Sequence, residues 1–307
     1  SGTVVAIEDR PHANRGTCLS VVIENDGTDT LHESVIPHGD LETLEPKDII
    51  EIVKNAGIVG MGGAGFPTYV KLNPGKPIDA VLVNACECEP MLTADHRLLL
   101  EFADDIVFGL LAEMKTVNAP KGIIVIEENK PDAIALLQEK TADIEGIEVL
   151  EVTTQYPQGG EKVLVYHTIG RVIKLGQLPA DVGCIVSNIS TLAAIGDYLK
   201  TGRPLVDRLV TVDGTAVKER KNVIVPIGTS MADVFGFCGG FSEEPAKVLY
   251  GGPMMGIAQY SLLPPVVKST SGLLCFTEEE VPDDENASCI RCGSCIDACA
   301  FKAIKEN

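Results

Sequence analysis

Four cysteines near the end of the sequence have the spacing of an iron–sulfur cluster loop. The segment Cys289-Ile-Arg-Cys292-Gly-Ser-Cys295-Ile-Asp-Ala-Cys299 follows the pattern C-x2-C-x2-C-x3-C. Thiolates at this spacing hold the corners of a cubane cluster from a single loop. A zinc site more often has two separated pairs of cysteines. The segment therefore predicts a 4Fe-4S cluster whose ligands are Cys289, Cys292, Cys295 and Cys299.

The fourth ligand of this cluster has more than one candidate. Where two such clusters share a chain, the fourth cysteine of each loop serves the other cluster, and no second quartet follows before Asn307. Cys299 would then serve a cluster whose other ligands lie outside this sequence. Cys275 is the nearest alternative, although an acidic stretch separates it from the loop. We expect a labile cluster that holds less iron than a complete cubane.

A glycine-rich segment follows the first predicted helix. It contains Gly60, Gly62, Gly63, Ala64, Gly65, Phe66 and Thr68, and Lys71 comes close behind. Glycines let the backbone approach a ligand and direct N–H groups at a phosphate, and a lysine can add a positive charge to the same anion. No clear strand precedes the segment, so it is not the standard dinucleotide-binding fingerprint. It predicts a phosphate cradle, with a plain glycine-rich turn as the alternative.

A second candidate segment is Asn84-Ala-Cys86-Glu87-Cys88-Glu89-Pro90, which follows a short apolar run. If that run is a strand of a parallel sheet, the segment lies at the carboxyl edge, where α/β proteins bind ligands. Asn84 can hydrogen-bond the edge of a flat heterocycle, and Glu87 and Glu89 can accept hydrogen bonds from one. The alternative is that both carboxylates are solvated loop charges. We expect this segment and residues 57–71 to meet in one crevice.

Alternating strands and helices would position these segments. Apolar runs at 80–84, 122–126, 149–153 and 183–187 are typical of buried strands, and the stretches between them have helical spacing. Such alternation predicts βαβ units and a mainly parallel sheet. After residue 204 the pattern becomes β-rich with a single helix, which predicts a compact β-grasp-like sheet.

The chain therefore divides into four predicted parts. They are the end of a truncated β-rich domain (1–40), an α/β domain (41–204), a β-grasp domain (205–265), and a linker with the cluster segment (266–307).

Composition excludes several classes of function. With 25 basic and 44 acidic residues the net charge is −19, which disfavours nucleic acid because its binding depends on basic side chains at phosphates. No apolar run approaches the roughly 20 residues of a membrane-spanning helix. The ten cysteines accompany no secretory signal, so thiols and metal ligands are expected instead of disulfides. In the C-x-C pair of Cys86 and Cys88 we expect buried, neutral thiols.

Together these segments resemble a known family. The glycine-rich segment, Asn84–Pro90 and the cysteine quartet are similar, in this order, to the flavin-carrying, NADH-oxidising subunit of respiratory complex I. A closer likeness is to the C subunit of the Rnf ferredoxin:NAD oxidoreductase complex and to the related proline-reductase-associated electron-transfer protein. Residues 156–162, 178–183 and 251–256 are similar to that narrower group.

The resemblance implies a Rossmann-like parallel-sheet domain that binds FMN and NADH, followed by a soluble-ligand-binding β-grasp domain and a ferredoxin-type cluster module. The FMN would be held by the glycine-rich segment together with Lys71, Asn84, Tyr156, Gly160, Glu161 and Asn188. NADH would lie over the flavin near Phe66 and Glu89. At Cys86 the sequence departs from complex I, whose subunit has an acidic residue there.

The implied activity is electron transfer between NADH, FMN and 4Fe-4S clusters toward a partner redox protein, with no side chain acting as an acid or base. The implied partners are membrane Rnf-type subunits or a reductase such as proline reductase. The implied location is the cytoplasm, peripheral to the inner membrane through those subunits. Two alternatives are a cobalamin reductase of the same superfamily and a non-catalytic scaffold that has lost the flavin.

Overall fold

The computed structural model describes residues 1–14, 16–281 and 289–299. A four-stranded parallel sheet with the order β5-β4-β3-β6 is its central element. The strands are β3 (Ala80–Ala85), β4 (Lys121–Glu127), β5 (Ile147–Val152) and β6 (Cys184–Asn188). The predicted α/β class with a parallel sheet is therefore confirmed.

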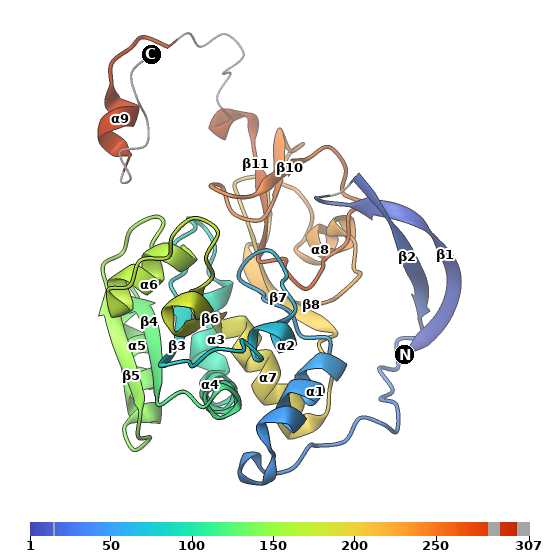
Figure 1. The fold of residues 1–307 in the computed structure, drawn as a ribbon. Coiled ribbons are helices and arrows are strands. Elements are labelled where there is room, and N and C mark those ends of the chain that lie inside the picture. The colour runs from blue at the N-terminus through green and yellow to red at the C-terminus, as the bar shows by residue number, and fades with distance from the viewer. Residues whose placement is uncertain (15, 282–288, 300–307) are drawn as a thin grey trace.

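Helices cover both faces of this sheet (Figure 1). They are α1 (Pro46–Asn55), α2 (Thr68–Lys71), α3 (Ala94–Glu101), α4 (Ala103–Val117), α5 (Pro131–Thr141), α6 (Glu161–Ile169) and α7 (Ile189–Thr201). Val81 and Val83 of β3 pack into a core shared with α1, α3, α4, α5 and α7. On the opposite face, Leu82 packs with Leu164 and Val165 of α6. Because the central strands are buried on both faces, their sequences are continuous apolar runs.

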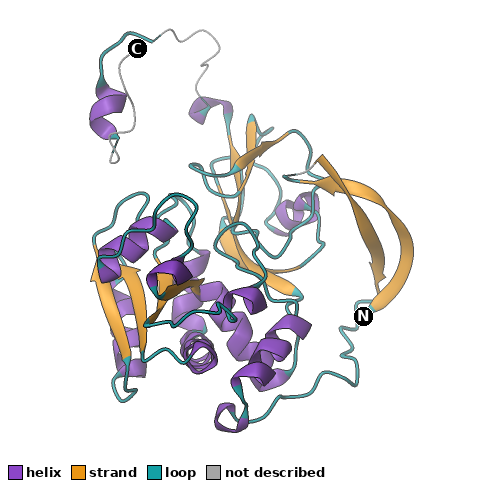
Figure 2. Ribbon diagram, in the orientation of Figure 1, coloured by secondary structure: helices purple, strands orange, loops and turns teal. Residues whose placement is uncertain are grey.

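A second, five-stranded sheet has the order β10-β9-β11-β7-β8. Its strands are β7 (Asp207–Asp213), β8 (Lys221–Pro226), β9 (Lys247–Tyr250), β10 (Ile257–Gln259) and β11 (Gly272–Phe276). The pair β11 and β7 is parallel and the other pairs are antiparallel. Helix α8 (Met231–Phe237) buries Phe235 against this sheet. The arrangement agrees with the predicted β-grasp fold (Figure 2).

Strand β11 extends this second sheet beyond residue 265, where we placed the end of the β-grasp domain. It lies between β9 and β7, and Leu273, Leu274 and Cys275 are fully buried there. A strand in the middle of a sheet belongs to the sheet's core, so the unit continues at least to Phe276. The other predicted domain limits stay predictions.

The first residues form a long antiparallel hairpin of β1 (Gly2–His12) and β2 (Gly16–Asn25). It arches outward at the right of Figure 1, and its turn contacts the second sheet, where Nε2 of Gln259 donates to the Ala13 carbonyl at 3.2 Å. Both strands are longer than the runs at 3–7 and 19–24 that the sequence indicates. Within the described part of the chain, no helix has the length and apolar character needed to cross a membrane.

Candidate functional site

The predicted crevice lies where the order of the parallel sheet reverses. The chain passes from β3 to β4 and β5 on one side and returns to β6 on the other side of β3. Asn84 lies near the end of β3 and Asn188 ends β6, and these two residues are direct partners in the parallel register. Open α/β sheets bind ligands at the carboxyl ends of strands at such a switch point. Both asparagines that the sequence analysis selected therefore lie side by side at the favoured position.

The glycine-rich segment packs against this switch point. A Cβ on Gly62 would lie 2.8 Å from Cβ of Asn188, so only glycine fits there without displacement. The Gly60 N–H donates to the Phe66 carbonyl at 2.8 Å and closes the loop. Since Asn188 is the register partner of Asn84, the two segments approach the same edge of the sheet. That they line one crevice stays a prediction.

The outer part of the glycine-rich segment faces open space. Gly62, Gly63 and Ala64 are exposed, and no described atom lies within 4 Å of a Cβ built on Gly63 or Gly65. Gly65 has a φ of 71°, which an L side chain rarely adopts. The hydroxyl of Thr68 is buried without a hydrogen-bond partner among the described residues. This backbone can receive a ligand closely, as a phosphate cradle requires.

Asn84 joins this edge to residues 156–161. Its Nδ2 donates to the Gly159 carbonyl at 2.9 Å, and its Oδ1 accepts from the Cys86 N–H at 3.1 Å. A Cβ on Gly159 would lie 2.6 Å from the Cys86 carbonyl oxygen. Gly159 is thus required for close approach, although the sequence analysis selected its neighbour Gly160. Its N–H also donates to the Cys88 Sγ at 3.4 Å.

Gly160 and Glu161 begin helix α6 beside this contact. Gly160 is the N-cap residue, and Glu161 is exposed in the first turn.

Burial and Glu127 raise the pKa of Cys86 to about 12. Burial also raises the pKa of Cys88. Both cysteines are therefore neutral thiols near neutral pH.

The two carboxylates of the second segment have different surroundings. Glu87 Oε1 accepts from the Asp95 N–H at 2.7 Å and its Oε2 from the His96 N–H at 3.1 Å, at the start of α3. Burial and the charge of Asp95 raise the pKa of Glu87 to about 7. Both carboxyl oxygens of Glu87 thus accept hydrogen bonds from backbone N–H groups, and these bonds stabilise the start of α3. Its predicted role toward a cofactor stays a prediction.

Glu89 has one oxygen available for a ligand. Its Oε2 accepts from the Met254 N–H at 3.0 Å, and its Oε1 is buried with no partner in the described structure. Burial and Glu89 raise the pKa of Tyr156, which places this phenol nearby. Glu87, Cys88, Glu89, Lys130 and Tyr156 line a cavity of about 450 Å³. A buried carboxylate oxygen without a partner can accept from an N–H or O–H of a ligand.

Lys71 lies beneath the crevice. Its Nζ donates to the Val186 carbonyl at 2.6 Å. Glu113 of α4 is fully buried and its Oε1 accepts from the Ser187 hydroxyl at 3.0 Å. Burial raises the pKa of Glu113, and Lys71 opposes that rise. The sequence analysis missed Glu113, whose place among the apolar residues of α4 was the available signal. The predicted contact of Lys71 with a phosphate stays a prediction.

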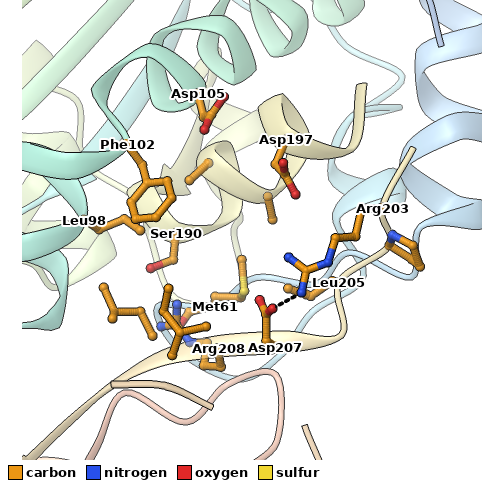
Figure 3. A pocket seen from close by; sticks show the side chains of 15 residues that line it. Met61, Leu98, Phe102, Asp105, Ser190, Asp197, Arg203, Leu205, Asp207 and Arg208 are labelled. Carbon is orange, nitrogen blue, oxygen red and sulfur yellow. Dashed lines mark hydrogen bonds and ion pairs between the residues drawn. The ribbon is translucent and has the colours of Figure 1, made fainter. Parts of the chain in front are cut away.

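A second cavity of about 370 Å³ separates α3, α4 and α7 from the segment that leads into β7 (Figure 3). Phe102, Asp197, Arg203 and Arg208 are among the residues that line it, and Arg203 pairs with Asp207. None of the cofactor-binding residues predicted from the sequence lines this cavity. Arg208 and Met61 lie next to each other in its wall.

The cysteine quartet lies apart from both sheets. Cys289, Cys292 and Cys295 are exposed, and α9 (Ser294–Ala298) begins after Gly293. Four thiols at this spacing suit an iron–sulfur cluster chemically, but the described residues contain no gathered group of three or more metal-ligating side chains. The cluster stays a prediction.

Cys275 does not offer a fourth ligand for such a cluster. Its side chain is fully buried in the core of the second sheet, and burial raises its pKa to about 11. A thiol enclosed in this way cannot reach a separate loop without opening the sheet.

The residues at the crevice fit a flavin nucleotide. The exposed part of the glycine-rich backbone offers N–H groups suited to a phosphate. The unpartnered Thr68 hydroxyl and Glu89 Oε1 offer polar contacts to the remainder of the ligand.

Two family models match separate regions of this chain. Residues 53–197 match the model of the Nuo51 FMN-binding domain, and residues 209–258 match the SLBB domain. The crystal structure of an NAD+-reducing [NiFe]-hydrogenase in the air-oxidized state has a similar fold. It superposes with a TM-score of 0.67 at 21% identity, over 79% of this chain and 51% of that chain.

Curated relatives match over nearly the whole chain. The C subunit of the proton-translocating ferredoxin:NAD(+) oxidoreductase complex of Clostridium ljungdahlii is 46% identical over 97% of this chain and 66% of its own length. Its Na(+)-translocating counterpart from Acetobacterium woodii is also 46% identical, over 97% and 68%. The C subunit of the ion-translocating oxidoreductase complex of Rhodobacter capsulatus is 39% identical, over 97% and 58%. This chain thus spans about two thirds or less of these relatives. It belongs to the family of the C subunits of ion-translocating ferredoxin:NAD(+) oxidoreductase complexes.

Proposed function

We propose that this chain is the flavin- and NADH-binding part of an electron-transfer subunit. It acts between NADH, FMN and 4Fe-4S clusters and delivers electrons to, or receives them from, a partner redox protein. The observation that carries this proposal is made at the switch point. There the glycine-rich segment contacts Asn188, the register partner of Asn84, and Glu89 follows in the loop after β3. The names of the curated relatives support the same redox couple.

The side chains of the crevice bind and orient in this proposal. The segment from Gly60 to Thr68 would hold the phosphate, and Glu89 Oε1 would accept a hydrogen bond from the nicotinamide. Tyr156, in the loop before α6, lines the same cavity as Glu89 and would limit the access of water to the bound ligand. When bound, the flavin would take two electrons from a nicotinamide and release them singly to clusters.

The names of the relatives support a proposal about partners and location. The relatives are named as subunits of ion-translocating complexes, so we propose membrane-bound partner subunits and a position at the cytoplasmic side of the membrane. A soluble reductase such as proline reductase is the alternative partner. Cys289, Cys292 and Cys295 would be cluster ligands, with Cys299 as the fourth or as a ligand of another cluster.

Visible absorbance of the purified protein tests this function. We expect flavin bands after reconstitution with FMN, and loss of those bands when NADH is added without oxygen. Glu89→Gln should retain FMN but bleach more slowly with NADH, because it alters a contact to the nicotinamide and leaves the glycine-rich segment unchanged. A protein that binds no FMN would be the scaffold of the alternative hypothesis. A protein that binds FMN but is not reduced by NADH would refute the proposed electron donor.

Iron and sulfide assays after anaerobic reconstitution test the cluster separately. Cys292→Ser should lower the iron content, whereas Cys275→Ala should not, because Cys275 is enclosed in the second sheet. Equal iron content in the unaltered protein and in Cys292→Ser would refute the proposed cluster ligands.

A further inference from the structure

The exposed glycine-rich backbone is attached to the body of the protein at Met61. The side chain of Met61 is buried. Its N–H donates to the hydroxyl of Thr191 in α7 at 3.0 Å. Its carbonyl accepts from Nη2 of Arg208 at 3.4 Å. Gly62 follows directly, so the two contacts to Met61 determine where the ligand-facing backbone begins.

Arg208 reaches this position from the other domain. It belongs to β7 of the five-stranded sheet, is 5% exposed, and its Nε donates to the Thr270 carbonyl at 2.9 Å. Burial lowers the pKa of Arg208, while the carboxyl groups of Asp95 and Glu87 oppose this. A guanidinium remains charged even when buried. One cation thus bonds to both domains and lies close to two acidic groups of the crevice.

Asp95 links the same cation to the switch point. Its carboxylate accepts from Nδ2 of Asn188 at 2.9 Å and from the hydroxyl of Ser190 at 3.1 Å. Asn188 in turn contacts Gly62. The glycine-rich segment is therefore held from two directions, through Met61 and through Asn188, and the charge of Arg208 acts on both.

We propose that Arg208 is a positioning residue of the crevice, and that the β-grasp domain thereby forms part of the ligand site. By holding the Met61 carbonyl, it fixes the exposed backbone from Gly62 to Gly65 in the arrangement that receives a phosphate. A backbone fixed before binding loses less conformational freedom when the ligand arrives, which raises affinity. The identity of the ligand as FMN rests on the proposed function, but the contact between Arg208 and the segment does not.

Two measurements on the full chain test this inference. The first is amide hydrogen exchange of residues 60–68 in the flavin-free protein, and the second is the dissociation constant of FMN. Arg208→Met should speed exchange in this segment and raise the dissociation constant about tenfold, the effect of losing a hydrogen bond from a charged group. Arg208→Lys should bind FMN more tightly than Arg208→Met, because an ammonium can still donate to one carbonyl. Thr191→Val removes the other anchor and should also speed exchange.

Arg203→Gln is the matched control. Arg203 lines the same cavity, but it pairs with Asp207 near the surface and makes no described contact with the glycine-rich segment. Its replacement should leave exchange and FMN affinity unchanged. Two results would overturn the inference. In the first, Arg208→Met has the same amide exchange rates at residues 60–68 as the unaltered protein and an FMN dissociation constant within twofold of it. In the second, Arg203→Gln changes both quantities as much as Arg208→Met does. If the unaltered protein binds no FMN, the proposed function fails, and hydrogen exchange alone still decides the role of Arg208.

Discussion

A half-buried lysine and a fully buried glutamate lie beneath the crevice, and the lysine favours the charged form of the glutamate. Glu113 is fully buried, and Lys71 is the cation that opposes the rise of its pKa. We expect Lys71→Met to lower the free energy of unfolding by about 2 kcal/mol, because a buried carboxylate then lacks its counter-charge. Adding Glu113→Gln should restore most of this loss, since glutamine keeps the acceptor for Ser187 without the charge. Urea denaturation of both variants measures the effect.

Lys54→Met is the control for this pair. Lys54 forms an exposed ion pair with Glu51, and such surface pairs contribute little. If the losses from Lys71→Met and Glu113→Gln simply add, the two side chains do not interact, and the account of a balanced pair is wrong.

Glu87 makes stability depend on pH in a defined window. Its pKa in the folded chain is raised from the ordinary 4.5 to about 7, first by burial and then by Asp95. The contribution of protonated Glu87 to the free energy of unfolding is therefore at its maximum below pH 4.5, and it is lost as the pH rises through about 7. The difference in unfolding free energy between the unaltered protein and Glu87→Gln should fall from about pH 5 to about pH 8. A difference that stays constant over this range would contradict the assignment.

Some residues of the site could be predicted from the sequence, and others could not. Asn84 and Asn188 were selected from the sequence, and the parallel register places them together. Arg208 was not selected, because one arginine in a β-rich stretch gives no sign that it bonds to a carbonyl 147 residues away. Gly159 was not separated from Gly160, because the approach to Cys86 depends on tertiary contact.

At the scale of elements, the glycine-rich segment has one face against the sheet edge and one face open. A methyl group on Gly62 would press on Asn188, whereas one on Gly63 would meet no described atom within 4 Å. Gly62→Ala should therefore destabilise the flavin-free protein by about 1–2 kcal/mol, and Gly63→Ala by less than about 0.5 kcal/mol. Both variants should weaken FMN binding, because the ligand would occupy the open space beside Gly63. Thermal unfolding without ligand and titration with FMN separate the two effects. Unchanged FMN affinity in Gly63→Ala would place the ligand elsewhere.

The elements predicted from the sequence were those with strong apolar patterns. Strands β3, β4 and β6 were found because they are buried on both faces, and α5 because Pro131 marks its start. The stretch between β3 and β4 has helical spacing in the sequence, and the structure divides it into α3 and α4 at Phe102, where φ is −124°. No proline or glycine marks that break. Strand β11 was missed because its pairing with β7 and β9 joins residues far apart in sequence.

At the scale of the whole molecule, polar contacts connect the core of the five-stranded sheet with the larger of the two cores of the parallel sheet. One side of the parallel sheet forms the larger core with α1, α4 and α7, and the five-stranded sheet forms the second core with α8. Between them, Glu89 accepts from the Met254 N–H, Arg208 donates to Met61, and Lys268 donates to the Gly57 carbonyl at 2.5 Å. Hydrogen bonds depend on direction more than apolar packing does, so this junction can hold the β-grasp domain in one orientation over the crevice.

Thr211 of β7 makes a central contact in this junction. Its hydroxyl oxygen accepts from the N–H groups of Thr93 and Ala94 at 3.0 and 2.9 Å, at the start of α3, and its hydroxyl donates to Asn222 at 2.9 Å. Thr211→Val keeps the shape but leaves those N–H groups without an acceptor, which should cost about 2 kcal/mol. Because the loss falls between the two cores, we expect the single unfolding transition to broaden or divide into two in calorimetry. Thr229→Val removes one local bond to the Pro226 carbonyl within the second sheet and should change little. If Thr211→Val unfolds in one sharp transition at the midpoint of the unaltered protein, the two cores are coupled by other contacts than these.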